Sequence, residues 1–502
     1  MMGKSYILTI DQSTSGTKAL LFDQSGSILG KTALDHKQQY PQPGWVEHDP
    51  MEIYGNVLQA VQRVLQETGT SPEQLAALTV TNQRETAVVW DRETGLPVYN
   101  AIVWQCRRTA ALCEELKLKG KEPVIQEKTG LVLDPYFSAS KFRWILDHAE
   151  AEAESNAGRR RAEGRLLAGT MDSWLLWKLT GGKVHATDYT NASRTSLFNI
   201  HTLQWDQELI ELFGVQGLQL PEVKSSNEVY GWTADPALFD GRVPVTGVIG
   251  DSQAALFGQL CHAPGMAKAT YGTGTSVMMN IGPVLAAQPG NGLVTAVAWG
   301  LDGKVDYALE GIIHCTGDCM RWVRDQLGLF TDYAEAEKQA ASLGDNEGVY
   351  VVPAFVGLGA PYWSPQARAA VMGLSRRSDK RHVIRAALES IAYQVRDTVE
   401  LMEAESGIRL RELRADGGAA DNRFLMQFQA DLLQASVKKP VMTELSALGS
   451  AYIGGLTVGF WSSKEQLLTL SREPVMYVPA MDKGLTERYY GGWKTAVSAV
   501  IS

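Results

Sequence analysis

The chain has 502 residues, enough for two to four domains, and its 45% hydrophobic and 21% charged content is typical of a globular protein. Its formal net charge of −9 argues against a nucleic-acid partner or an anionic membrane surface. Five scattered cysteines indicate reduced thiols in a cytoplasmic protein, not a disulfide framework. Apolar runs stay well short of the roughly 18 residues of a membrane span. The N-terminus lacks the apolar core of a signal peptide, so we expect a soluble intracellular protein.

The first predicted element is a β-hairpin. An apolar run from Tyr6 to Ile10 ends at Asp11, and a second apolar run, Ala19 to Phe22, follows Lys18. Hydroxyl and glycine residues dominate the turn between them, and the backbone N–H groups of such a turn can bind an anion. Lys18 adds positive charge, and Asp11 can hold a metal ion through water. The pattern fits a nucleotide polyphosphate with Mg²⁺, and it also fits an ordinary hairpin turn rich in Ser and Thr.

The next two predicted elements are a strand and a helix, and neither belongs to a P-loop. Gly26 and Gly30 are separated by three residues, whereas a Walker A loop requires four and opens a helix at its lysine. The segment instead fits a turn at 23–26 and a strand at 27–33. The helix is predicted at Met51 to Gln66, where apolar residues recur on one face: Ile53, Val57, Val61 and Leu65.

A pair of opposite charges follows the predicted strand that ends at Val80. Arg84 presents a fork of donors and Glu85 a pair of acceptors, which suits a polyhydroxy ligand. Trp104 and Tyr136 are candidate walls for that ligand. The alternatives are a surface ion pair that contributes little to stability, and two aromatic residues of the core.

A carboxylate ends the predicted strand at Val243 to Gly250. Asp251 is followed by a small, helix-prone segment, and a carboxylate in this position projects into a cleft in α/β folds. There it can accept a proton from a substrate hydroxyl. Asp251 can equally be a helix N-cap, and the two roles are compatible.

The second half of the chain repeats the first hairpin. A break at Gly258 to Gly265 indicates a domain crossing, and Ala267 to Met279 is again strand, Gly/Thr/Ser turn and strand. This repeat predicts a duplicated fold with a ligand between the halves, although a chance similarity of short segments is the alternative.

A glycine turn is predicted near the end of the second half. The stretch from Leu413 to Phe424 has the pattern of strand, turn and helix start, and its glycines allow close approach to a flat ligand. Asn422 is a candidate for a hydrogen bond to a base or a phosphate, or for the cap of the following helix. A helix with a small-residue face, Ala447 to Gly455, is expected to pack beneath this turn.

Several long stretches carry a resemblance to the FGGY carbohydrate kinase family, and within it to the glycerol kinases, that runs almost end to end. They are Tyr40 to Pro50, Thr81 to Thr86, Tyr99 to Thr109, Asp188 to Thr195 and Gly357 to Trp363. The resemblance implies an α/β fold of two ribonuclease-H-like (actin-like ATPase) domains flanking a central cleft. Residues 1–257 would carry the polyol site and the first phosphate turn. Residues 258–502 would carry the second phosphate turn and the adenine site.

The resemblance also implies a role for each candidate residue. Asp251 would be the general base on the attacking hydroxyl, and Asp11 would hold Mg²⁺ through water. The polyol would contact Arg84, Glu85, Trp104 and Tyr136. The phosphates would contact Thr14, Ser15, Lys18 and Thr273. The nucleotide would be bordered by Gly317, Gly418 and Asn422.

Four positions depart from typical glycerol kinases. Ser252 stands where these enzymes have Gln, and Ser276 stands where they usually have Phe against the glycerol carbons. Lys18 replaces Arg in the first turn, and Arg321 replaces a Gln that many relatives have beside the nucleotide site. The lost volume at Ser252 and Ser276 predicts a roomier pocket that accepts a longer polyol or a ketose, such as erythritol, xylitol or xylulose.

The function that the resemblance implies is ATP-dependent phosphorylation of a terminal hydroxyl of a small polyol, with glycerol to sn-glycerol 3-phosphate as the first expectation. An actin-fold ATPase without a polyol substrate and a sugar-sensing repressor are the alternatives from other classes. The family also implies a homo-oligomer, a dimer or a tetramer. Region 233–242 lacks a glycine-rich pattern and a histidine, so we expect neither fructose 1,6-bisphosphate control nor phosphorylation by a histidine phosphocarrier.

Overall fold

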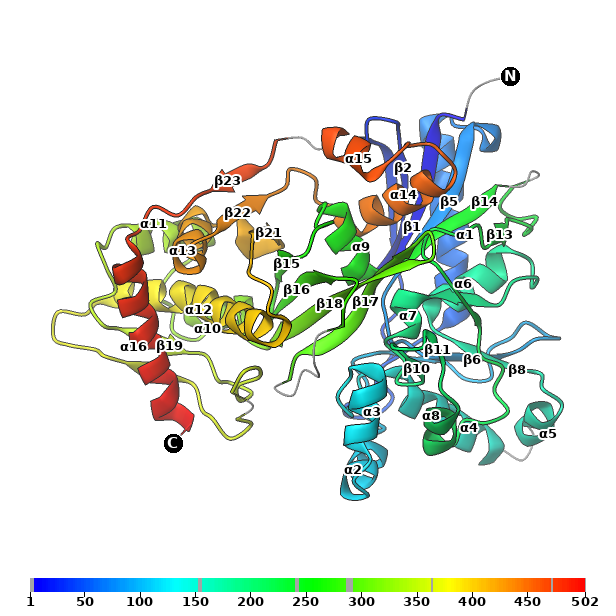
Figure 1. The fold of residues 1–502 in the computed structure, drawn as a ribbon, viewed down its shortest axis with the longest axis horizontal. Coiled ribbons are helices and arrows are strands. Elements are labelled where there is room, and N and C mark those ends of the chain that lie inside the picture. Colours follow the sequence, from blue (N-terminus) through cyan, green and yellow to red (C-terminus); the bar gives the residue numbers. More distant parts are fainter. Residues whose placement is uncertain are drawn as a thin grey trace. The chain divides into compact units, whose positions relative to one another are not determined.

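The first β-sheet of the computed structural model has six strands in the order β13-β14-β5-β1-β2-β3 (Figure 1). Strand β2 pairs antiparallel with both β1 and β3, and β5 pairs in parallel with both β1 and β14. The opening hairpin and the strand at 27–33 are therefore confirmed. The bounds are β1 Tyr6–Gln12, β2 Gly16–Phe22, β3 Ile28–Asp35, β5 Leu75–Asn82, β13 Gly231–Trp232 and β14 Pro244–Gly250.

The second sheet repeats the same arrangement, with the strand order β17-β18-β16-β15-β21-β22-β23. Strands β15 and β16 form the antiparallel hairpin, and β15 pairs in parallel with β21, as β1 does with β5. The predicted repeat of the first hairpin is thus confirmed at the level of sheet topology. The bounds are β15 Met266–Tyr271, β16 Thr275–Gly282, β17 Val294–Leu301, β18 Lys304–Ile313, β21 Glu412–Asp416, β22 Ser436–Lys439 and β23 Val475–Tyr477.

The remaining strands form short pairs. These are β4 Glu47–His48 with β7 Ala101–Ile102, β6 Val88–Asp91 with β8 Leu166–Gly169, β9 Ala186–Asp188 with β12 Glu222–Lys224, β10 Phe198–Asn199 with β11 Gln204–Trp205, and β19 Tyr350–Val352 with β20 Ala370–Met372.

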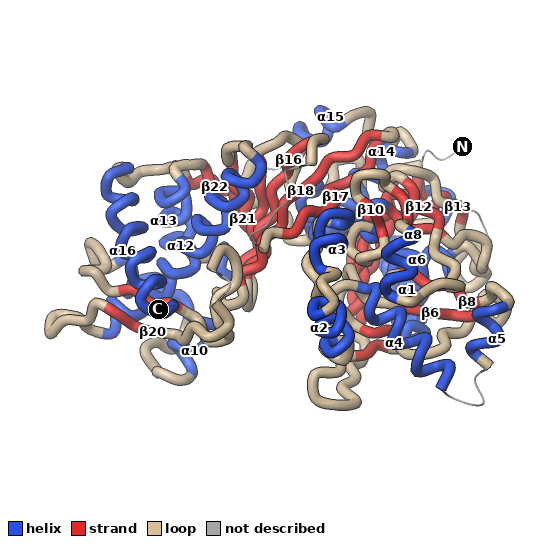
Figure 2. The backbone as a smooth tube through the Cα atoms, turned by 60° about the horizontal axis from the view of Figure 1, so that its bottom comes forward, coloured by secondary structure: helices blue, strands red, loops and turns tan. Residues whose placement is uncertain are grey.

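Helices follow the strands throughout the chain, and Figure 2 shows α12, α13 and α16 side by side. The first helices are α1 Pro50–Thr68, α2 Ala110–Leu118, α3 Glu122–Thr129, α4 Ser138–Ala151, α5 Ala157–Ala162, α6 Met171–Leu179, α7 Tyr189–Ala192, α8 Gln207–Phe213 and α9 Asp251–Gly258. The later helices are α10 Gly317–Asp325, α11 Tyr333–Ala341, α12 Lys380–Ser406, α13 Arg423–Leu433, α14 Leu445–Thr457, α15 Lys464–Leu470 and α16 Lys483–Ile501. Across the described ranges, none of these helices combines the length and the apolar character that a membrane crossing requires.

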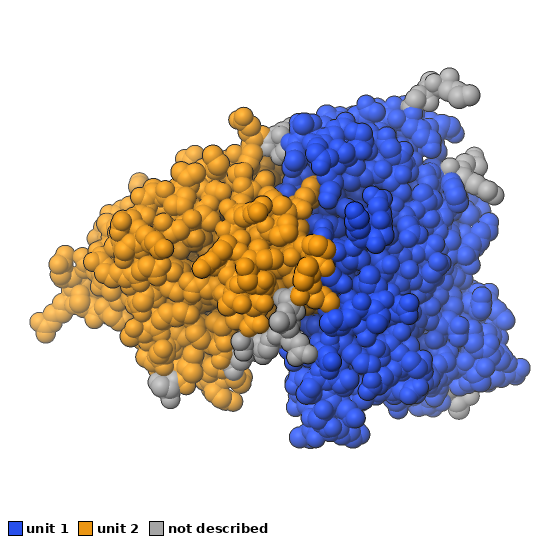
Figure 3. All heavy atoms as spheres, in the orientation of Figure 1, with its two compact units in different colours: residues 1–260, 296–307, 444–471 blue, residues 261–295, 308–443, 472–502 orange. Residues whose placement is uncertain are grey.

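The chain divides into two compact units, each of which is discontinuous in sequence (Figure 3). The first unit contains residues 1–260, 296–307 and 444–471, and the second contains 261–295, 308–443 and 472–502. The first crossing falls inside the predicted break at 258–265. The division into domains 1–257 and 258–502 stays a prediction, since the compact units interleave along the chain.

The structure describes residues 4–151, 156–239, 243–285, 292–362, 364–470 and 473–501. Two parts of the sequence interpretation fall outside these ranges. They are Asp240 to Arg242, the last residues of region 233–242, and Trp363, the last residue of the family-like stretch Gly357 to Trp363.

Two helices cover opposite faces of the first sheet. Alternate residues of β1 and β5, among them Leu8 and Leu78, are buried in one cluster with the apolar face of α1. The intervening residues point to the opposite face of the sheet, toward α14. Thr79 of β5 lies there against Gly454 of α14, with its methyl carbon 2.2 Å from where a Cβ of residue 454 would be. Helix α1 begins one residue before the predicted start, and its N-cap is Asp49, whose side chain accepts a hydrogen bond of 2.8 Å from Met51 N.

Helix α14 corrects one expectation. It was predicted to pack beneath the 413–424 turn, but it belongs to the first unit and packs on α9 and on strands of the first sheet. Its small-residue face does allow close packing, since a Cβ at Gly449 would lie 1.8 Å from the Ala254 carbonyl oxygen. The sequence therefore indicated the packing face of the helix but not its partner, which lies about two hundred residues earlier in the chain.

Candidate active site

Asp251 lies where β14 ends and α9 begins. Gly250 is the N-cap of α9 and Asp251 is its first helical residue, so the N-cap alternative is wrong for Asp251. Its carboxylate accepts a hydrogen bond of 2.6 Å from Ser252 N, and Arg84 Nε lies 3.3 Å from its Oδ1. The side chain remains 35% exposed. A carboxylate held by a cation and by a helix N-terminus, yet still accessible, can accept a proton from a bound hydroxyl.

The Arg84–Glu85 pair is buried, so the surface ion-pair alternative is wrong. The side chains are 6% and 1% exposed, and Arg84 also donates to Gln253 Oε1 at 3.2 Å. Glu85 has a φ of 61°, and Thr86 N donates to Arg84 O at 2.8 Å across it, which makes a γ-turn. A non-glycine residue in this conformation costs about 1–3 kcal/mol and persists where the surroundings enforce it, typically at functional sites.

Arg194 holds the Glu85 carboxylate from the other side. Its Nε donates to Glu85 Oε1 at 2.5 Å, and its guanidinium lies 5.7 Å from the ring centre of Tyr136 and 5.1 Å from that of Phe137. The Arg194 side chain is fully buried. This contact connects the predicted acceptor Glu85 to the segment that carries the predicted wall Tyr136.

Trp104 and Tyr136 are half-buried and lie against each other, so neither is an ordinary core aromatic residue. Their ring centres are 5.4 Å apart with a tilt of 59°. The indole Nε1 of Trp104 donates to Thr14 Oγ1 at 2.9 Å. Trp104, a predicted wall of the polyol site, is therefore hydrogen-bonded to Thr14 of the predicted phosphate turn within the first unit.

The first turn is shorter than predicted, since β1 extends to Gln12 and β2 begins at Gly16. Thr14 and Ser15 lie in the turn, and Ser15 is exposed. Asp11 and Lys18 face each other across the hairpin, with Nζ 3.5 Å from Oδ2. The ammonium also donates to Glu444 Oε2 at 2.8 Å. Glu444 directly precedes α14, so a residue from near the end of the chain completes the turn.

Negative charge accumulates at this turn. Burial raises the pKa of the Asp11 carboxyl to about 6, Lys18 opposes that shift, and the charges of Asp251 and Glu444 add to it. Burial would also raise the pKa of Glu444, but its contacts with Lys18 and Lys31 outweigh burial and hold that pKa below its usual range. A divalent cation beside Asp11 would relieve this repulsion.

The donor set at Asp11 suits Mg²⁺. Within the part of the chain that the structure describes, no group of three His, Cys, Asp or Glu side chains is arranged to hold a metal ion. Mg²⁺ usually keeps several waters and binds through one or two carboxylates plus substrate phosphates, so a lone buried Asp is an appropriate protein ligand.

The second turn is built from backbone. Within the second unit, Thr316 N and Asp318 N donate to Thr273 O at 3.0 and 3.1 Å, and Gly317 N donates to Gly272 O at 3.0 Å. Thr273 itself is exposed. A Cβ at Gly317 would lie 2.4 Å from Gly272 O, so this approach requires glycine. The hairpin turn is thereby fixed to the N-terminus of α10.

The other predicted residues of the second unit have separate environments. Gly418 faces open space, with no atom within 4 Å of a Cβ built there. Asn422 is the N-cap of α13, and its side chain accepts a hydrogen bond of 2.8 Å from Leu425 N, which confirms the cap alternative. A contact of Asn422 with a nucleotide stays a prediction. The Arg321 side chain is about half exposed, and its Nη1 lies 3.5 Å from Asp318 Oδ1. Ser276 Oγ lies 3.3 Å from Glu310 Oε1.

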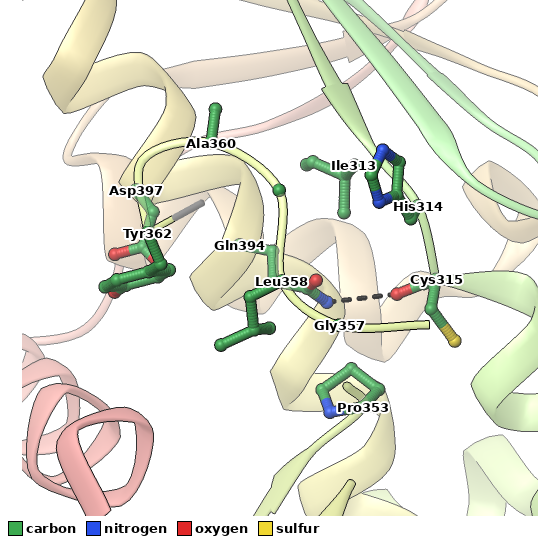
Figure 4. Close-up of a pocket in the computed structure, with 11 residues that line it drawn as sticks. Ile313, His314, Cys315, Pro353, Gly357, Leu358, Ala360, Tyr362, Gln394 and Asp397 are labelled. Carbon is green, nitrogen blue, oxygen red and sulfur yellow. Dashed lines mark hydrogen bonds between the residues drawn. The ribbon is translucent and has the colours of Figure 1, made fainter. Parts of the chain in front are cut away.

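A small pocket of the second unit lies under the 353–362 loop (Figure 4). Gln394 donates to Cys315 O at 3.1 Å there, and the Asp397 carboxylate accepts from Tyr362 at 2.9 Å and from Trp493 at 2.8 Å. None of the predicted site residues lines this pocket. These polar groups are occupied by protein partners, so we assign the pocket no role.

Family models match both halves of the chain. The N-terminal domain of the FGGY family of carbohydrate kinases matches residues 6–258, and the C-terminal domain of that family matches 267–458. The chain belongs to the FGGY family of carbohydrate kinases. The predicted family and the predicted two-domain α/β fold are confirmed.

Individual relatives of this FGGY kinase span its whole length. Glycerol kinase of Geobacillus kaustophilus is 52% identical over 498 residues, and the match covers 99% of each chain. Glycerol kinase of Thermus thermophilus is 51% identical over 498 residues, again with 99% coverage of both. The solved structure of Plasmodium falciparum glycerol kinase with ADP superposes with a TM-score of 0.94 at 34% identity, covering 100% of this chain and 99% of that one.

Sequence reasoning missed three residues of this FGGY kinase that contact predicted ones. Arg194 lies in a stretch that carried the family resemblance, but its partner Glu85 is 109 positions away. Gln253 and Glu444 are likewise bonded to Arg84 and Lys18. A carboxylate directly before the small-residue helix was the one local signal for Glu444.

Proposed function

We propose that this protein transfers the γ-phosphoryl group of ATP to a terminal hydroxyl of glycerol, giving sn-glycerol 3-phosphate. The observation that supports this most is the buried Arg84–Glu85 pair beside the accessible Asp251. Full-length relatives at 50–52% identity that are glycerol kinases support the same substrate.

On this proposal, the first unit binds the polyol. Arg84 donates to a hydroxyl, Glu85 accepts from one, and the Trp104–Tyr136 wall packs on the carbons. Asp251 accepts the proton of the attacking hydroxyl and is oriented by Arg84 Nε at 3.3 Å. Phosphoryl transfer depends mainly on alignment and charge stabilisation, so a carboxylate within hydrogen-bond reach of the hydroxyl is sufficient.

The nucleotide contacts on this proposal are divided between the units. Lys18, Thr14 and Ser15 bind phosphate oxygens in the first unit, and Asp11 would hold Mg²⁺, which neutralises phosphate charge when bound. In the second unit the phosphates contact Thr273, and the nucleotide is bordered by Gly317, Arg321, Gly418 and Asn422.

The departures at Ser252 and Ser276 favoured a roomier pocket for a longer polyol or a ketose. The full-length glycerol kinase relatives do not favour that alternative. Side-chain volume at two positions is a weaker argument than similarity along the whole chain.

Polyol-dependent formation of ADP tests the proposal. Purified enzyme is assayed with Mg·ATP alone and with glycerol, erythritol, xylitol, dihydroxyacetone or xylulose. We expect ADP formation to require a polyol and glycerol to give the highest kcat/KM. ADP formation that is independent of polyol would instead indicate an ATPase, and a higher kcat/KM for xylitol or xylulose would support the roomier pocket.

We also propose a cytoplasmic homo-oligomer, a dimer or a tetramer. All five cysteines are buried free thiols, which suits a reducing compartment. Sedimentation equilibrium over a range of concentrations measures the oligomeric state, and a monomer at every concentration would contradict it.

A further inference from the structure

A fully buried lysine lies at the start of α4, directly after the segment that carries Tyr136. The ammonium of Lys141 donates to three consecutive backbone carbonyls, at 2.7 Å to Pro135, 2.5 Å to Tyr136 and 2.9 Å to Phe137. An ammonium has three N–H donors, so all of them are used on this one segment. Three bonds from one rigidly buried group fix the backbone of residues 135–137.

The same segment is connected to the predicted acceptor Glu85. Ser138 Oγ donates to the Glu85 carbonyl at 3.1 Å. Arg194, which bonds the Glu85 carboxylate, has its guanidinium over the rings of Tyr136 and Phe137. A shift of the 135–137 backbone would therefore move the Tyr136 ring and the support of Glu85 together.

We propose that Lys141 is a positioning residue for the polyol: it fixes the 135–137 backbone and so sets the placement of Tyr136 and Glu85. This inference rests on the proposed kinase function. It assigns to Lys141 no contact with the substrate. Its effect should fall on glycerol binding and leave nucleotide binding nearly unchanged, because Lys18, Thr14 and Ser15 make none of these bonds.

The charge state of Lys141 gives the inference a second readout. Burial lowers the pKa of Lys141 to about 7, and four facing groups oppose that shift: Glu85, Cys106, Cys113 and Asp134. Below this pKa the ammonium has three donors, and above it the neutral amine has two. One of the three carbonyls therefore loses its donor as the pH rises through 7, and the segment is held less firmly.

The test compares Lys141→Met with the native enzyme at pH 6 and pH 8.5. Lys117→Met is the control, because Lys117 is a partly exposed lysine of α2 that pairs only weakly with Glu114 at 3.4 Å. At pH 6 we expect Lys141→Met to raise the KM for glycerol about tenfold or more, since hydrogen bonds to a charged group are lost. The KM for ATP should change less than about twofold. The ratio of the two enzymes' glycerol KM values should be smaller at pH 8.5.

Equal changes in both KM values, or an unchanged glycerol KM in the folded variant, would overturn the inference. A double-mutant cycle with Tyr136→Phe adds a test that a general loss of stability does not mimic. If Lys141 acts through Tyr136, the two effects on glycerol affinity are not additive, and additive effects would contradict the inference.

If Lys141→Met does not fold, calorimetric titration of the native enzyme with glycerol between pH 6 and 8.5 decides. Glycerol affinity that weakens as the pH rises through 7 supports the inference, and a glycerol affinity that does not change with pH overturns it. Failure of the proposed function itself is a different result, namely no polyol-dependent ADP formation by the native enzyme at any pH.

Discussion

The two hairpin turns share one topology but are built from different chemistry. In each unit the first strand of the hairpin pairs antiparallel with the second strand and in parallel with a strand that comes later in the chain. In the first unit Lys18 is held by Asp11 and Glu444, and Glu444 also bonds Lys31. That turn is therefore organised by charged side chains.

The second turn is organised by glycine and backbone instead. A Cβ at Gly274 would lie 2.4 Å from Ile313 O, and one at Gly317 would lie 2.4 Å from Gly272 O. Thr275 Oγ1 donates to Thr316 Oγ1 at 3.0 Å and completes an uncharged network. The same topology is thus held by charged side chains in the first unit and by glycine contacts and backbone hydrogen bonds in the second. Substitutions in the first turn should act through charge, and substitutions in the second through steric strain.

Asp251→Asn should have the largest effect, because the first unit carries the proposed base as well as its charged turn. The amide has the same shape but cannot accept the proton of the hydroxyl, so we expect kcat to fall about 10²- to 10⁴-fold. The Kd for ADP, measured by calorimetry, should stay within about twofold. A variant with near-native kcat would remove Asp251 as the base.

Lys18→Met tests the charged turn and has a matched control. Both Lys18 and Lys31 bond Glu444, but only Lys18 also faces Asp11 in the hairpin. We expect Lys18→Met to raise the KM for ATP about 10- to 100-fold, the usual cost of losing a hydrogen bond to a charged group. Lys31→Met should change it less than about twofold.

Salt dependence sharpens this comparison. The contribution of a partly exposed ammonium falls as ionic strength rises, so the ratio of the Lys18→Met and native KM values should shrink between low and high salt. Equal effects of the two lysine variants would indicate that Glu444, and not a phosphate contact, explains the role of Lys18.

The local parts of the structure were predictable from the sequence. The hairpin at 6–22, the helix at 51–66 and the strand that ends at Asp251 each follow from residue periodicity and from cap or turn residues within a few positions. Asp251, Arg84 and Glu85 stood out because charged residues directly after core strands are unusual. These signals need no information about the rest of the chain.

The supporting contacts were not predictable, because their partners are distant in sequence. Lys18 and Glu444 are 426 positions apart, and no local pattern pairs them. The γ-turn at Glu85 is likewise enforced by its surroundings, since glutamate has no intrinsic preference for a positive φ. The partner of α14 was misplaced for the same reason: a small-residue face indicates close packing but not the element it packs against.

Gly274→Ala tests the glycine-built turn. The added Cβ would lie 2.4 Å from Ile313 O and 3.1 Å from His314 O, and backbone atoms cannot move away as a flexible side chain can. Overpacking of this kind typically costs about 1–3 kcal/mol, so we expect a clear fall in Tm by calorimetry, with little dependence on salt. A strong salt dependence of the loss would contradict the distinction between the two turns.

Gly418→Ala should have the smallest effect and separates strain from ligand contact. No atom of the protein lies within 4 Å of a Cβ at Gly418, in contrast to Gly274, so the methyl group meets no steric obstacle in the protein itself. We therefore expect an unchanged Tm. If Gly418 borders the nucleotide as we propose, the methyl group should still raise the KM for ATP about three- to tenfold by crowding the ligand. The KM for glycerol should change less than the KM for ATP, because all its proposed contacts except Ser276 lie in the first unit. An unchanged KM for ATP would remove Gly418 from the nucleotide site and leave the second turn as that unit's proposed contact with the phosphates.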